Sequence, residues 1–156
     1  MTIQIGDKIP KATLNYLKDG VQAINTDELF DGKKVVLFAV PGAFTPTCSA
    51  KHLPGFKQLG PDIKAKGVDT IACLSVNDAF VMRAWGEDQA VGDDILMLAD
   101  GSGAFTKAVG LEMDATRFGM GQRSQRYSMI LHDGKVEKLL VEPGPGLNAS
   151  SADSVL

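Results

Sequence analysis

The residue types with the clearest chemical potential stand together in the segment Pro41-Gly42-Ala43-Phe44-Thr45-Pro46-Thr47-Cys48. A thiolate is a nucleophile, and a cysteine that opens a helix is favoured as an anion by the unpaired N–H groups there. Thr45 stands three residues before Cys48, where a Cys-x-x-Cys motif would have its second thiol. A hydroxyl at this spacing can hold a substrate oxygen, which indicates oxygen transfer rather than disulfide exchange. From position alone, Cys48 could equally be a small buried hydrophobic residue.

The second thiol has a different setting. Cys73 lies within the apolar segment 70–76, where a small core residue is the simplest interpretation. Two cysteines are too few for a disulfide scaffold, so we expect a reducing compartment, the cytoplasm, and no removable signal or transit segment.

The two histidines offer little support for metal chemistry. His52 follows Cys48 by four residues on one helical face, where it could tune the thiolate as a cation or could simply be packed. His52 and His132 show no metal-ligand spacing with the cysteines or with each other. The glycine-rich stretches lack both common phosphate-binding patterns. We therefore expect no metal and no cofactor.

Several apolar side chains could line an apolar mouth of the site, although such residues often serve as core or dimer contacts instead. They are Phe44, Phe80, Leu111 and Phe118.

Composition narrows the class of protein. The chain has 156 residues, 44% of them hydrophobic, and a formal net charge of −3, which is typical of one soluble globular domain over residues 1–156. The charge gives no general attraction to nucleic acid or anionic lipid. No apolar run approaches the length of a membrane span.

The elements that must position the site follow from the apolar pattern. Residues 34–40 are apolar on both faces, as expected of a central strand covered by helices on both sides. A loop over 41–47 leads to a helical pattern from Cys48 to about Lys66, and Pro54 predicts a kink near residues 53–55.

The remaining pattern predicts an α/β fold with a mixed central sheet flanked by helices and an N-terminal hairpin extension. Strands are expected at 12–16, 21–24, 68–76, 95–98, 127–132 and 136–141. Helical segments are expected at 26–30, 78–89, 103–109 and 149–156. We expect Asn77 to cap the helix over 78–89.

Pro41, Thr45 and Cys48 match the Pro-x-x-x-Thr/Ser-x-x-Cys signature, and the chain in this way resembles the peroxiredoxins. The stretches 41–49, 51–56, 73–78 and 126–128 are similar to the subfamily that contains mammalian peroxiredoxin 5 and the plant type II enzymes. The resemblance implies a thioredoxin-like fold, a cysteine peroxidase without metal or haem, and commonly a homodimer.

The resemblance also implies roles for four residues. Cys48 would be the peroxidatic cysteine, Thr45 its hydroxyl partner, Pro41 a shield against water and Arg126 the cation beside the sulfur. A helix end supplies roughly 0.3–1 kcal/mol to an anion, whereas a guanidinium at about 4 Å can supply on the order of 4 kcal/mol before its desolvation. Without the resemblance, Arg126 could be a surface arginine like its neighbour Arg123.

The family that the chain resembles uses more than one route to reduce the oxidised cysteine. Mammalian members resolve the sulfenic acid with a C-terminal cysteine, but this chain has no thiol in the stretch 146–151. Plant type II members carry a cysteine where Cys73 stands and are often served by glutathione and glutaredoxin. We expect that external route, with thioredoxin as the alternative reductant and Cys73 as a possible resolving residue.

Two other functions stay open on sequence grounds. A thioredoxin-like domain can be a non-catalytic redox sensor or interaction module. A thiol–disulfide oxidoreductase is disfavoured because Cys-x-x-Cys is absent.

Overall fold

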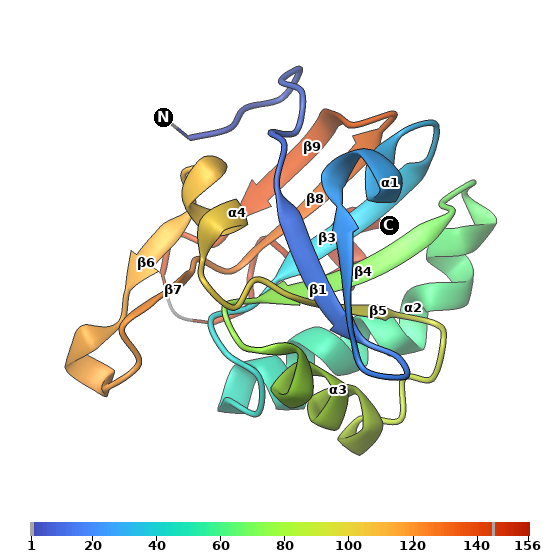
Figure 1. Cartoon of the computed structure of the whole chain (residues 1–156). Coiled ribbons are helices and arrows are strands. Elements are labelled where there is room, and N and C mark those ends of the chain that lie inside the picture. The colour runs from blue at the N-terminus through green and yellow to red at the C-terminus, as the bar shows by residue number, and fades with distance from the viewer. Residues whose placement is uncertain (1, 145) are drawn as a thin grey trace.

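The computed structural model describes residues 2–144 and 146–156, arranged around a seven-stranded sheet in the order β2-β1-β5-β4-β3-β8-β9 (Figure 1). The strands of this sheet are β1 (Thr13–Leu17), β2 (Val21–Asn25), β3 (Lys34–Ala39), β4 (Thr70–Ser75), β5 (Leu96–Ala99), β8 (Tyr127–His132) and β9 (Lys135–Val141). β3, β4 and β5 run parallel, and the two ends of the sheet are antiparallel hairpins. The predicted mixed sheet and N-terminal hairpin are confirmed.

Helices cover both faces of the sheet, because the central strands are apolar on both sides. On one face, Val36 and Phe38 of β3 pack with α2 (Leu53–Ala65), α3 (Ala79–Asp88) and α5 (Ala152–Val155). On the other face, Val35 and Leu37 pack with α1 (Thr26–Phe30) and with Phe105 of α4 (Ala104–Ala108). The chain therefore has two apolar layers, one on each side of the sheet.

The expected kink takes the form of a π-helical turn over Cys48–His52 that leads directly into α2. The N–H of Leu53 donates to the carbonyl of Cys48, five residues back. Pro54 cannot donate to any carbonyl, so the chain widens here instead of continuing as a regular α-helix. Turns of this kind are frequent at functional sites.

Asn77 does not cap α3, contrary to expectation. Asp78 is the N-cap, and its carboxylate accepts a hydrogen bond from the N–H of Val81. The side chain of Asn77 instead accepts hydrogen bonds from the N–H of Ala43 at 3.0 Å and from Ser75 Oγ at 2.8 Å. Asn77 thus joins the end of β4 to the loop that precedes Cys48.

A small hairpin arm was not expected from the sequence. It consists of β6 (Glu112–Asp114), a 3-10 turn (Thr116–Phe118) and β7 (Gln122–Ser124), and Figure 1 shows it projecting from the body of the molecule. Arg123 fixes its base, because its guanidinium donates to the carbonyl of Val76 at the end of β4.

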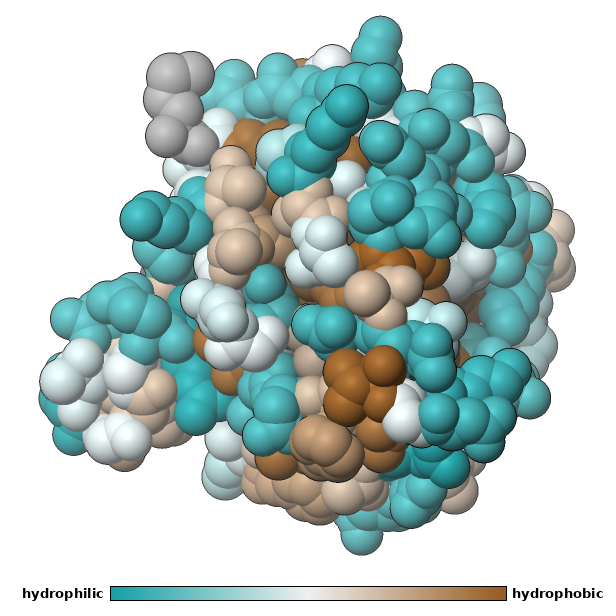
Figure 2. All heavy atoms as spheres, viewed as in Figure 1, coloured by the Kyte–Doolittle hydropathy of each residue, from teal (hydrophilic) through white to brown (hydrophobic). Residues whose placement is uncertain are grey.

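The surface in Figure 2 is mostly polar, with tan and brown side chains gathered at the lower part of the view, where Figure 1 has α3. Within the described residues, no helix is long and apolar enough to cross a membrane.

Candidate active site

The loop before Cys48 begins where β3 ends, at the edge of the sheet that also holds the end of the parallel strand β4. The N–H of Val40 donates to the carbonyl of Leu74, which continues the pairing of the two strands. Crevices at the carboxyl ends of parallel strands are the usual place for ligands in α/β folds. The loop lies at such an edge.

Thr45 closes this loop into a tight turn. Its hydroxyl donates to the carbonyl of Gly42 at 2.7 Å, so the lone pairs of Oγ1 remain free to accept a hydrogen bond from a substrate. Phe44, just before it, has a φ of 63°, a left-handed conformation that non-glycine residues adopt rarely. Strained residues of this kind cluster at functional sites. Pro41 is half-buried at the start of the same turn.

Cys48 is completely buried at the start of the π-helical turn. Its sulfur accepts a hydrogen bond from Nη2 of Arg126 at 2.9 Å. Arg126 is itself only 8% exposed. Among the described residues, no carboxylate oxygen lies within 4.0 Å of this guanidinium. The sulfur therefore stands where a buried cation would normally have its counter-charge.

His52 lies on the other side of the same guanidinium. Its Nδ1 is 2.8 Å from Arg126 Nη1, and its Nε2 is 2.9 Å from the carbonyl oxygen of Ser150. Because a guanidinium can only donate, Nδ1 must accept, and the ring proton must be on Nε2, which donates to Ser150. His52 is thus a neutral ring held between one donor and one acceptor.

Burial and the nearby guanidinium of Arg126 lower the pKa of His52 from 6.5 to about 3, although the hydrogen bond to Ser150 and the charge of Glu142 act to raise it. The interpretation of His52 as a cation that tunes the thiolate is therefore wrong. Its ring packs against Phe38 and Phe56, with centroids 5.0 and 5.5 Å away, which explains the desolvation.

Glu142 and Ser150 are functional candidates that the sequence did not reveal. The buried carboxylate of Glu142 accepts hydrogen bonds from the N–H groups of Asn148, Ala149 and Ser150 and from the hydroxyl of Ser150, at 2.6–3.1 Å. Burial acts to raise the pKa of Glu142, but these hydrogen bonds outweigh it and lower the pKa. The carboxylate is therefore charged and fixes residues 148–150.

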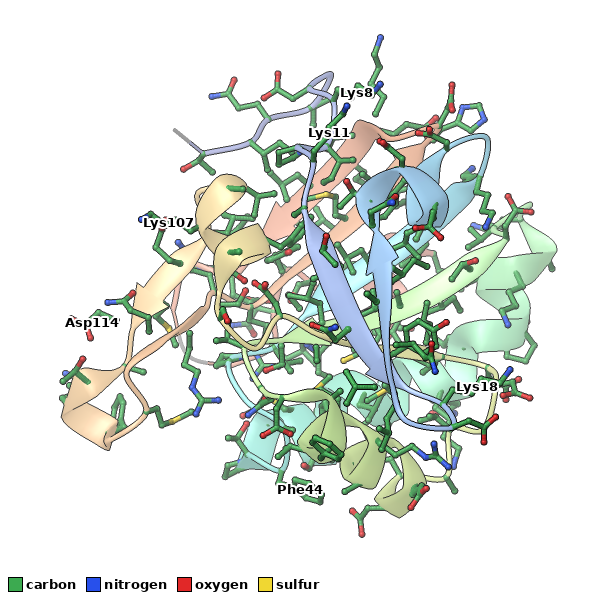
Figure 3. All side chains as sticks on the ribbon, in the orientation of Figure 1. Lys8, Lys11, Lys18, Phe44, Lys107 and Asp114 are labelled. Atoms are coloured by element: carbon green, nitrogen blue, oxygen red, sulfur yellow. The ribbon has the colours of Figure 1, made fainter. Side chains whose placement is uncertain are left out.

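The four apolar residues proposed for the mouth do not form one cluster. Leu111 is 1% exposed in the apolar layer on the opposite face of the sheet from Cys48. Phe118 is exposed on the turn of the hairpin arm, and Phe80 is exposed on α3. Phe44 lies at the lower edge of the molecule in Figure 3, with its ring centroid 6.5 Å from that of Trp85.

Trp85 of α3 is completely buried and is linked directly to the site. Its Nε1 donates to the hydroxyl of Ser49 at 3.0 Å. Ser49 is the residue after Cys48, so this hydrogen bond joins α3 to the π-helical turn.

Cys73 is completely buried on β4, beside Phe38 of β3, in the same apolar layer as Cys48. Both thiols are free. Burial raises the pKa of Cys73 well above its usual range, so its thiol is neutral at physiological pH. In the part of the chain that the structure describes, no cluster of three or more His, Cys, Asp or Glu side chains could hold a metal ion.

Comparison with known proteins identifies the class. The model of the Redoxin family matches residues 4–156. Peroxiredoxin-2E-2, chloroplastic, from Oryza sativa subsp. japonica is 53% identical, over 99% of this chain and 72% of its own length. Peroxiredoxin-2B from Arabidopsis thaliana is 47% identical, over 99% and 96%. Reduced Prx3 from Vibrio vulnificus, solved in complex with hydrogen peroxide, is 56% identical with a TM-score of 0.95, over 99% and 97%.

The chain therefore belongs to the Redoxin family and has its thioredoxin-like α/β fold. Within that family it is a peroxiredoxin, a thiol peroxidase with an antioxidant function, of the subfamily that contains peroxiredoxin 5 and the plant type II enzymes. These relatives do not favour the alternative of a non-catalytic sensor.

The buried neutral His52 predicts how stability depends on pH. Between pH 6.5 and about 3 the unfolded chain binds a proton at this residue and the folded chain does not. The free energy of unfolding should therefore fall as the pH is lowered through this window, by up to about 1.4 kcal/mol per pH unit from His52 alone. Urea unfolding of the wild type and of His52→Asn at pH 7, 6, 5 and 4.5 measures the difference. Parallel curves would contradict the assignment.

Proposed function

We propose that Cys48 is the peroxidatic cysteine and that Arg126 both activates it and stabilises the transition state. The observation that carries the proposal is the 2.9 Å hydrogen bond from Arg126 Nη2 to the sulfur within a buried site. A cation taken out of water is costly unless an anion faces it, so the buried guanidinium favours the thiolate over the thiol. The N–H groups of the first helical turn act in the same direction.

Thr45 and Pro41 complete the site in this proposal. The hydroxyl of Thr45 gives its proton to Gly42, so Oγ1 accepts a hydrogen bond from the O–H of the peroxide and aligns the O–O bond with the sulfur. Pro41 brings no N–H and helps to keep water from the reacting atoms. Arg126 is placed to donate to the peroxide oxygens as the leaving oxygen gains charge.

The reaction is a displacement at oxygen. The Cys48 thiolate attacks one oxygen of the peroxide, an S–O bond forms and the O–O bond breaks. The product is a sulfenic acid, Cys–SOH, and the leaving alkoxide or hydroxide takes a proton from water. Cys48 is oxidised by two electrons and the peroxide is reduced to an alcohol or water.

The proposed substrates are hydrogen peroxide and organic hydroperoxides. The similar Vibrio vulnificus structure is described as a complex with hydrogen peroxide, which supports the first. The half-exposed ring of Phe44 in the loop before Cys48 offers an apolar contact for the alkyl part of the second.

Replacing Cys48 by Ser should abolish turnover of both hydrogen peroxide and cumene hydroperoxide in the presence of dithiothreitol, because a hydroxyl is not ionised at neutral pH. Serine has nearly the shape of cysteine, so the thermal unfolding curve should stay close to that of the wild type. Cys73→Ser is the matched control and should retain turnover with dithiothreitol. Peroxide consumption by Cys48→Ser at the wild-type rate would end the proposal.

We further propose that an external thiol reduces the sulfenic acid, with glutathione and glutaredoxin as the main route and thioredoxin as the alternative. Glutathione condenses with Cys–SOH to give a mixed disulfide and water, and a second thiolate releases Cys48 and forms glutathione disulfide. The neutral, buried thiol of Cys73 is a poor nucleophile. Cys73 is proposed to be a core residue.

The Cys73→Ser variant should therefore keep most of its turnover with glutathione and glutaredoxin. Intact-mass measurement after one equivalent of peroxide and then glutathione should find the adduct on Cys48 in both proteins. A variant that is inactive with every reductant, together with a quantitative Cys48–Cys73 disulfide in the wild type, would make Cys73 an obligatory resolving residue instead.

We also propose that the enzyme is a cytoplasmic homodimer. The protomer exposes three large aromatic side chains, Phe44, Phe80 and Phe118, by half to two thirds of their surface. Large aromatic residues at a surface are typical of protein interfaces. The two buried free thiols suit the reducing conditions of a cytoplasm.

Sedimentation velocity should give a species of twice the 16.6 kDa protomer mass. Phe80→Glu should shift it toward the protomer, because a carboxylate would be desolvated in the interface. Ile5→Glu is the matched control, since Ile5 is 65% exposed in the N-terminal segment, which Figure 1 shows at the opposite end of the view from α3. A protomeric wild type, or an equal shift in both variants, would contradict an interface at these phenylalanines.

A further inference from the structure

We infer that Glu142 is a positioning residue for the thiolate site, acting through Ser150 and His52 on the guanidinium of Arg126. The inference rests on the proposed function, because it assigns to Glu142 the task of keeping Arg126 directed at Cys48. Glu142 touches neither the sulfur nor any place where a peroxide would react. Its action is carried by a continuous series of hydrogen bonds.

The first step is the hold of Glu142 on the segment 146–150. This segment has neither helix nor strand. Three consecutive backbone N–H groups, those of residues 148–150, point at one carboxylate, and the hydroxyl of Ser150 makes a further hydrogen bond to it. Hydrogen bonds to a charged acceptor are the strong kind. The carboxylate therefore determines the path of this segment.

The second step is the orientation of one carbonyl. With its N–H and hydroxyl bound to Glu142, Ser150 presents its carbonyl oxygen to Nε2 of His52 at 2.9 Å and also to the hydroxyl of Ser128. This carbonyl sets the tautomer of the ring, because it can only accept. It thereby leaves Nδ1 without a proton and facing Arg126.

The third step is the position of the guanidinium. Nη1 of Arg126 donates to His52 Nδ1 at 2.8 Å, and Nη2 donates to Cys48 Sγ at 2.9 Å. The rigid guanidinium plane fixes the second bond once the first is made. Glu142 also holds this residue by the main chain, since its N–H donates to the carbonyl of Arg126. A protonated Nδ1 would put two donors face to face and move the guanidinium.

The charge of the carboxylate gives this series its strength. Glu142→Gln has the same shape, but its oxygen is uncharged, and when that oxygen takes the place of Oε2 the NH2 group faces the N–H of Asn148, which also donates. These weaker hydrogen bonds would hold the Ser150 carbonyl less firmly, and His52 would exchange between tautomers. A misplacement of about 1 Å can cost up to two orders of magnitude in rate, so we expect peroxide attack to slow by about tenfold or more.

The test compares Glu142→Gln with Glu137→Gln, which makes the same charge change at an exposed position of β9, the strand that Glu142 directly follows. Stopped-flow measurement with hydrogen peroxide should find the slower step in Glu142→Gln only. Nitrogen NMR of His52 should show one Nε2–H tautomer in the wild type and in Glu137→Gln, and a mixture in Glu142→Gln. The NMR readout does not depend on peroxide chemistry, so it separates this inference from the role of Cys48.

Two variants of His52 locate the coupling. Asn keeps a polar atom where Nδ1 faces Arg126 but cannot reach Ser150, whereas Gln reaches toward Ser150 but has no acceptor for Arg126. Adding Glu142→Gln to His52→Asn should change the attack rate by less than about twofold, because the series is already interrupted. Full additivity of the two effects would overturn the inference. So would an unaltered His52 spectrum in Glu142→Gln.

A less disruptive variant tests the inference in case Glu142→Gln does not fold. Ser150→Ala removes one hydrogen bond to Glu142 and keeps the backbone carbonyl. It should slow peroxide attack in the same direction by a smaller factor, with a circular dichroism spectrum like that of the wild type. Wild-type rates in both Ser150→Ala and a folded Glu142→Gln would show that the carboxylate serves stability alone.

Discussion

The structure depends most on a buried guanidinium that has a sulfur, and not a carboxylate, beside it. A cation in an apolar layer is costly, and Arg126 is accommodated because three different parts of the chain face it. The start of the π-helical turn supplies Cys48, the end of that turn supplies His52, and the end of β9 holds its backbone. Any packing that separated these parts would leave the charge unpaired. In the proposed function, the arrangement that buries this charge is also the one that activates the sulfur.

The neutrality of His52 follows from the same constraint. A second cation beside Arg126 would repel it, and the aromatic rings of Phe38 and Phe56 exclude the water that a charged imidazole needs. As a neutral ring, His52 accepts a hydrogen bond from Arg126 at Nδ1 and donates one to Ser150 from Nε2. Its charge state is thus a result of packing, and Arg126 is the cation that donates to both the ring and the sulfur.

The sequence predicted those parts of the fold whose signal is local. The run over 34–40 indicated a strand covered on both faces, and the Asp-Gly turn predicted the β8–β9 hairpin, because burial and turn chemistry leave a pattern within a few residues. The hairpin arm was not predicted, because its strands have three residues each and are mostly polar. The contacts of Asn77 were not predicted, because an asparagine that caps a helix and one that accepts a long-range hydrogen bond look the same in sequence.

The residues of the site likewise differ in whether a local sequence pattern marks them. Cys48 and Thr45 stand in one short motif, and Arg126 could be added only through the likeness to a family. Glu142 and Ser150 lie far along the chain from His52, and His52 and Ser150 are 98 positions apart. Nothing in an isolated Glu or Ser marks it as part of a hydrogen-bond series. Such residues become visible only when the backbone brings them together.

The missing side chain at Gly42 limits which sequences can carry this loop. A Cβ atom at this position would meet Met120 Cε and Thr45 Cγ2 at 3.1 Å and Arg123 Nη1 at 3.4 Å. These three groups belong to the hairpin arm and to the turn that Thr45 closes, so one methyl group would push both at once. A side chain at position 42 would therefore require Met120, Thr45 and Arg123 to shift together by a few tenths of an ångström.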